Sequence, residues 1–124
     1  MLDSDGLYKL AAADREVVIT LQQAVLGGAS VRVTWPTLAE TLQGPAVSRV
    51  KYALSRLAVE PVEEQDWRDA GQLMHDSGMG GHTIDAALAT VARRLPPPVL
   101  ILTSDPDDLS RLTAQTPGIA VERV

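Results

Sequence analysis

Apolar positions along the chain follow two different periods, and their succession predicts strands interleaved with helices. The run Val99–Thr103 is short, apolar and bounded by prolines, which is typical of a strand buried on both faces. Residues 31–35 and 119–124 alternate apolar and polar positions, and residues 58–62 form another short β-rich run. Between these strands, apolar residues recur at helical spacing over residues 6–13, 16–26, 36–42, 46–57, 63–75, 83–94 and 107–115.

This alternation favours an α/β fold with a parallel sheet, because parallel strands need crossover connections that helices usually supply. No linker-like stretch interrupts residues 1–124, so we expect one domain. Helical spacing predicts that Ile84, Leu88, Val91 and Leu95 face the core from one helix. It predicts the same for Trp67, Ala70 and Met74 from the helix over residues 63–75.

The segment that follows the strand at residues 99–103 has the signals of a helix start. Asp105 stands at the expected N-cap, Pro106 at the first helical position, and Asp107 and Asp108 in the first turn. Taken alone, Asp105 is most simply explained as a helix cap. An acid at the carboxyl end of a buried strand is also placed where α/β sheets bind ligands.

Composition narrows the class of protein. The chain has 124 residues, 45% of them apolar, which is enough for one core. It has no cysteine, which excludes disulfides and thiolate metal sites. Its net charge of −5 disfavours a passive nucleic-acid binder. No apolar run approaches the length of a membrane span and no signal peptide is visible, so we expect a soluble, cytoplasmic protein without membrane attachment.

Four acids follow or open the predicted elements: Asp3, Glu40, Asp85 and Asp105. Taken singly, each acid has a simple structural explanation. Asp3 would be a turn residue beside a nearly absent first strand, and Glu40 a surface acid. Asp85 would be a first-turn acid and Asp105 a helix cap. Glu40 and Asp85, however, stand among small and apolar residues. Carboxylates brought together would repel one another unless cations were bound. Oxygen ligands select Mg²⁺ or Mn²⁺, so these acids are a candidate metal site.

Four segments that contain these acids form an ordered set of motifs. They are Leu2–Leu7 (LDSDGL), Thr37–Glu40 (TLAE), Ile84–Ala89 (IDAALA) and Leu102–Leu109 (LTSDPDDL). The set resembles, in the same order and over nearly the whole chain, the motifs of the PIN-domain ribonucleases, in particular the VapC-type toxins of bacterial toxin–antitoxin pairs. The resemblance implies a PIN-like three-layer fold, in which a central, mostly parallel sheet is flanked by helices.

The resemblance also implies an activity. It indicates a metal-dependent endoribonuclease that hydrolyses RNA phosphodiesters through a carboxylate-bound Mg²⁺ or Mn²⁺ ion, is commonly a homodimer, and is inhibited by a cognate antitoxin protein. By position, Asp3, Glu40, Asp85 and Asp105 would be the catalytic, metal-binding carboxylates. In-line attack by water on the phosphodiester, with a carboxylate as general base, is the expected reaction.

The resemblance assigns supporting roles near the last acid. Thr103 or Ser104 would hydrogen-bond the carboxylate cluster. Asp108 would hold a second metal or water, or cap the helix, and we favour the cap. Departures from the family pattern, such as the extra acid Asp5 and the few basic residues, leave open a catalytically degenerate PIN-fold protein that acts as an interaction module.

Other readings of the chain are weaker. A third alternative is a small-molecule α/β domain of the flavodoxin or response-regulator kind. A response-regulator receiver needs a lysine late in the chain, and the only lysines here are Lys9 and Lys51. The Gly-rich stretch 78–81 lacks the Gly-Lys-Ser/Thr ending of a phosphate loop. A zinc site from His75, Asp76 and His82 would span that loop without a further nitrogen or sulfur ligand. We expect His82 at a loop surface.

Overall fold

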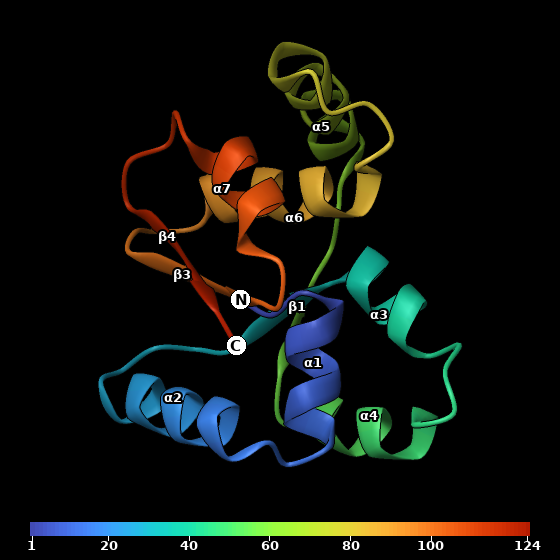
Figure 1. Cartoon of the computed structure of the whole chain (residues 1–124), viewed down its shortest axis with the longest axis vertical. Coiled ribbons are helices and arrows are strands. Elements are labelled where there is room, and N and C mark those ends of the chain that lie inside the picture. Colours follow the sequence, from blue (N-terminus) through green and yellow to red (C-terminus); the bar gives the residue numbers. More distant parts are fainter.

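The computed structural model describes residues 1–124 as a mixed α/β arrangement, which confirms the predicted class (Figure 1). Seven helices and four short strands follow one another along the chain. In order they are α1 (Ser4–Ala11), α2 (Arg15–Leu26), β1 (Arg32–Thr34), α3 (Trp35–Thr41), α4 (Val47–Leu54), β2 (Ala58–Glu60), α5 (Glu64–Ser77), α6 (Thr83–Arg94), β3 (Val99–Thr103), α7 (Pro106–Thr113) and β4 (Ile119–Arg123).

The strands form two parallel pairs. In the first, β1 lies beside β2 with Val33 opposite Val59. In the second, β3 lies beside β4 with Ile101 opposite Val121. All the predicted strands are therefore present, and β4 keeps the alternating burial of an edge strand.

The first two residues lie between these pairs. Leu2 forms a parallel bridge with Leu102 of β3, whose N–H donates to the carbonyl of Met1 at 2.9 Å. On the other side, the Leu2 N–H donates to the carbonyl of Arg32 in β1 at 3.0 Å. The nearly absent strand expected before Asp3 is thus a single bridge, and it links β1 to β3. Asp3 consequently leaves the sheet at the carboxyl ends of the parallel strands.

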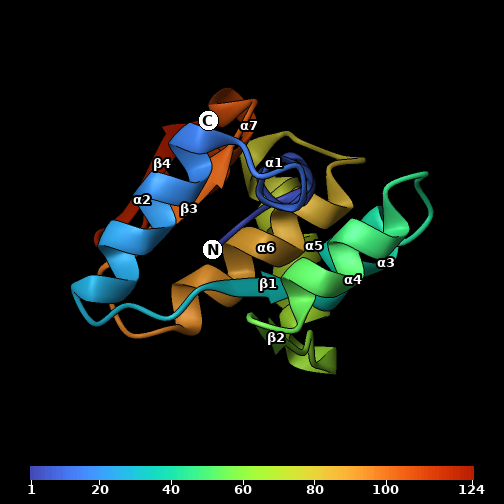
Figure 2. The same ribbon diagram turned by 90° about the horizontal axis from the view of Figure 1, so that it is seen from below.

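Helix α6 has more buried residues than any other element. Every residue from Ala86 to Val91 is buried, as is Ala92, whereas Ile84 and Leu95, which were also predicted to face inward, are only partly buried. The prediction of one inward face was too narrow because α5 and α7 cover α6 on one side while β1 and α3 contact it on another. Figures 1 and 2 show these elements around α6. Its buried alanines have small side chains, which leave room for such neighbours.

Helix positions agree with the sequence pattern, and their ends differ by a few residues. Helix α4 ends at Leu54 rather than at the predicted residue 57; the hydroxyl of Ser55 donates to the carbonyl of Tyr52 at 2.6 Å there. On α5, Ala70 is buried as predicted, but Trp67 is 40% exposed and does not join the core. None of the helices combines the length and the apolar character needed to cross a membrane.

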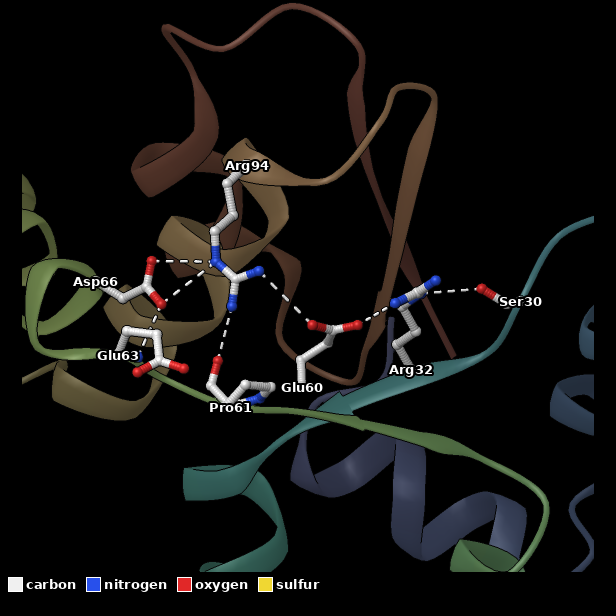
Figure 3. A network of polar contacts seen from close by, with 7 residues as sticks. All are labelled: Ser30, Arg32, Glu60, Pro61, Glu63, Asp66 and Arg94. Carbon is white, nitrogen blue, oxygen red and sulfur yellow. Dashed lines mark hydrogen bonds and ion pairs between the residues drawn. The ribbon is translucent and has the colours of Figure 1, made fainter.

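An ion-pair network holds the C-terminal end of α6 (Figure 3). The Arg94 guanidinium donates from Nε to both oxygens of Asp66, at 3.2 and 3.3 Å, and from Nη2 to the carbonyl of Pro61 at 2.7 Å. Its Nη1 lies 3.6 Å from Glu60, which also pairs with Arg32 of β1. Asp66 is buried, so this network fixes the start of α5 and the end of α6 against β1 and β2.

Candidate metal centre at the carboxyl ends of the strands

Three acids stand in the first turns of three helices. Asp3 is the N-cap of α1, and its Oδ1 accepts a hydrogen bond from the Gly6 N–H at 2.7 Å. Asp85 is the third residue of α6, and Asp108 is the third residue of α7. Helix N-termini favour negative charge, so the backbone stabilises carboxylates at all three positions.

A fourth acid comes from α3. Glu40 is exposed, and its Oε2 accepts a hydrogen bond from the hydroxyl of Ser4, the first residue of α1. The Glu40 charge acts on both Asp3 and Asp85. Asp3, Glu40 and Asp85, which the sequence separates widely, are therefore neighbours in the fold.

Burial raises the pKa of Asp3. Hydrogen bonds from the Thr103 hydroxyl and the Gly6 N–H oppose this rise, while the negative charges of Asp5 and Glu40 add to it. The Thr103 hydroxyl therefore acts on the carboxylate of Asp3. On balance the pKa of Asp3 is higher than that of an isolated aspartate, so Asp3 holds its proton more readily.

Burial also raises the pKa of Asp85, and the charge of Asp3 raises it further. His82 acts in the opposite direction, and Asp108 and Glu40 add smaller rises. No lysine or arginine is among the groups that shift the pKa of Asp3 or Asp85. Apart from the imidazole of His82, no basic side chain acts on these two carboxylates.

Asp105 is not part of the group of donor atoms that His82, Asp85 and Asp108 form. Asp105 is exposed, and it is not among the charges that shift the pKa of Asp3 or Asp85. It occupies the N-cap position of α7, but its side chain makes no capping hydrogen bond. Its backbone N–H donates instead to the Thr103 hydroxyl at 3.1 Å.

Asp108 does not make the expected cap either. Its Oδ2 lies 3.3 Å from Nδ1 of His82. Helix α7 packs on α6, and Asp108 in its first turn thereby comes close to Asp85. Asp108 is thus the acid of α7 that joins the cluster.

Ser104 contacts Asp5, whereas Thr103 acts on Asp3. Its hydroxyl donates to Asp5, and its carbonyl accepts a hydrogen bond from Nη1 of Arg123 at 2.6 Å. Asp5 was noted in the sequence only as an extra acid. It borders the cluster through its effect on Asp3.

His82 is the residue that sequence reasoning placed elsewhere. It is the N-cap residue of α6, with a 40% exposed side chain, and it lies among the acids rather than at an isolated loop surface. Its Nδ1 and one carboxylate oxygen each of Asp85 and Asp108 all lie within 4.8 Å of one another. Its place one turn before Asp85, on the same helix, was the available signal. His75, on α5, is not part of this group.

The Gly-rich loop positions His82. Helix α5 ends at Gly78 in the left-handed conformation with a φ of 64°, and Gly81 has a φ of 93°. Between them, the side chain of Met79 is buried against Ala86 and Leu112. Because Met79 packs in one cluster with residues of α6 and α7, the loop holds the start of α6 beside α7.

The chain matches no protein-family model. No curated protein matches it either.

The donor set of this cluster fits a divalent cation. Its ligands are carboxylate oxygens and one imidazole nitrogen, and all of them are partly exposed at one edge of the strands. Two cavities, of about 850 and 970 Å³, lie elsewhere and are not lined by these acids. The acids of the cluster are partly exposed and therefore accessible from solvent.

Proposed function

We propose that this chain is a metal-dependent endoribonuclease of the VapC toxin kind, with a PIN-like three-layer fold. The observation that carries the proposal is the meeting of Asp3, Glu40 and Asp85 at the carboxyl ends of parallel strands. The same three acids stand in motifs that resemble the PIN-domain ribonucleases. Agreement between an independent pattern of motifs and a spatial cluster supports a common role.

The acids would bind one divalent ion, Mg²⁺ or Mn²⁺. Such an ion supplies a nucleophilic water at neutral pH and neutralises negative charge on a phosphodiester. Ser4 fixes Glu40, and Thr103 with the Gly6 N–H fixes Asp3, so that the oxygens are oriented before an ion binds.

The charge of the chain is consistent with this role. A protein with a net charge of −5 repels RNA, but bound cations reverse the local field of a carboxylate cluster. A cognate antitoxin would cover this acidic rim and insert an arginine or lysine among the carboxylates. The homodimer and the cytoplasmic location implied by the resemblance and composition belong to the same proposal.

Cleavage of total RNA tests the proposal directly. The parent should cleave RNA with Mg²⁺ or Mn²⁺ and lose this activity on chelation, and Asp85→Asn should reduce the rate about 100-fold or more, as loss of an electrostatic contact to the reacting groups does. Asp107→Asn is the matched control, because Asp107 is an exposed first-turn acid of α7 outside the cluster. Equal cleavage by the parent and Asp85→Asn would overturn the proposal.

One observation favours a second candidate, a degenerate PIN-fold interaction module. Asp105, the fourth ligand implied by the resemblance, is exposed and stands apart from the electrostatic cluster. A protein of this kind would bind metal and a partner protein without hydrolysis. Metal binding by the parent, with no cleavage of any RNA at saturating Mn²⁺, would favour this candidate.

A further inference from the structure

His82 points its Nδ1 toward two carboxylates that come from different helices. Nδ1 lies 3.3 Å from Oδ2 of Asp108 and 3.9 Å from Oδ2 of Asp85. A simple His–Asp hydrogen bond would use one carboxylate, and the distance to Asp85 is longer than a hydrogen bond. Asp85 therefore takes no part in such a hydrogen bond, yet its carboxylate oxygen faces the same Nδ1.

The two distances from Nδ1 fit a shared ion better than a shared proton. Metals bound by His nitrogen and carboxylate oxygen at about 2.0–2.2 Å hold tetrahedral ligands about 3.4 Å apart. The two measured separations bracket this value, and all three donor atoms lie within 4.8 Å of one another. Small side-chain rotations would complete the site, because each donor is partly exposed.

The type of donor selects the type of ion. Mg²⁺ binds hard oxygen ligands and keeps several waters, whereas an imidazole nitrogen suits first-row transition metals. We propose that His82, Asp85 and Asp108 form a nitrogen-and-oxygen site for a first-row transition ion such as Mn²⁺, Co²⁺ or Zn²⁺, in preference to Mg²⁺. The proposal concerns which metal ion this site prefers. It rests on the proposed function only through Asp85, which belongs both to this site and to the carboxylate cluster of the proposed nuclease.

Charge around the site is consistent with cation binding. The imidazole faces Asp85 and Asp108, and Asp3 and Glu40 act on Asp85 from α1 and α3. No lysine or arginine forms an ion pair with any of these four acids. Three protein ligands would also leave further coordination positions open, as catalytic metal sites do.

The two histidines of the chain make the test selective. In the NMR spectrum of the parent, Co²⁺ should shift or broaden the ring signals of His82 and leave those of His75, which stands apart on α5. An equal effect on both rings, or none on His82, would overturn the proposal. This measurement needs no variant, so folding defects do not affect it.

Calorimetric titrations of Co²⁺ and Mg²⁺ then test selectivity. His82→Asn should weaken Co²⁺ binding at least about 10-fold and change Mg²⁺ binding much less, while His75→Asn should change neither. Asp108→Asn should weaken Co²⁺ binding, and Asp105→Asn should not. Equal losses for both metals, or a loss in Asp105→Asn without one in Asp108→Asn, would contradict the proposal. None of these readouts is RNA cleavage, so the two proposals are tested separately. The chain could prove to be a Mg²⁺-dependent nuclease without the proposed preference for transition ions, or could show that preference without cleaving RNA.

Discussion

The Cα of Gly6 lies so close to Leu102 that a methyl carbon at Gly6 would be 2.8 Å from the Leu102 carbonyl oxygen. Real Cβ atoms do not approach backbone oxygen at this distance. The same methyl carbon would be 3.3 Å from Oδ1 of Asp3, which the Gly6 N–H holds. Absence of a side chain at Gly6 thus allows α1 to begin directly against β3 with Asp3 at the edge of the strands.

Gly6→Ala should therefore lower the free energy of unfolding by about 1–3 kcal/mol, the usual cost of overpacking. Backbone atoms of β3 cannot move aside without disturbing the bridge to Leu2. Urea unfolding measures the change. Gly71→Ala is the control, because Gly71 lies inside α5 with nothing within 4 Å; alanine there should stabilise the protein by about 0.5–1 kcal/mol. A neutral Gly6→Ala would show that the close approach is not maintained.

Arg94→Gln should destabilise the protein by about 2 kcal/mol, a value between exposed and buried ion pairs. The change leaves Asp66, whose side chain is only 9% exposed, without its cation. Arg68→Gln on α5 is the matched control, since its pair with Glu64 is highly exposed and should contribute less than about 0.5 kcal/mol. Thermal unfolding of the two variants compares them, and equal losses would contradict a structural role for the network.

The raised pKa of Asp85 predicts how stability depends on pH. The folded protein holds the Asp85 proton more tightly than the unfolded chain, so folding stability falls as pH rises from the ordinary range of a carboxyl through the raised pKa. In metal-free buffer, Asp85→Asn should be more stable than the parent at pH 7, with the difference vanishing below the ordinary carboxyl range. Urea midpoints across pH measure this. Asp107→Asn should not show the gain, and a gain of the same size there would contradict the burial argument.

Ser4→Ala should weaken Mn²⁺ binding about 10-fold, because it removes the hydroxyl that orients Glu40, and groups behind metal ligands affect metal affinity by this order. Stability should change little, since the bond is at the surface. Electron paramagnetic resonance of free Mn²⁺ measures the affinity. Ser110→Ala, at an exposed position of α7, is the control. If Ser4→Ala bound Mn²⁺ as tightly as the parent, the proposed role of Ser4 in orienting Glu40 for metal binding would be wrong.

Much of the local structure follows from the sequence. The strand Val99–Thr103 and the helix Thr83–Arg94 have the predicted bounds, because a short apolar run and a regular helical period are local properties. Pro106 opens α7 as predicted for the same reason. The positions of Asp3 and Asp85 at element boundaries were also local, and these two acids are found in one cluster.

Only the tertiary structure decided which other side chains complete the cluster. Asp105 and Asp108 are one helical turn apart, and the sequence motif indicates the first; the packing of α7 on α6 brings the second beside His82. The pairing of Asp66 with Arg94 likewise depends on α5 lying against α6. Helical and strand periods are set by each residue's own neighbours, whereas the direction of a side chain relative to another element depends on how whole helices pack.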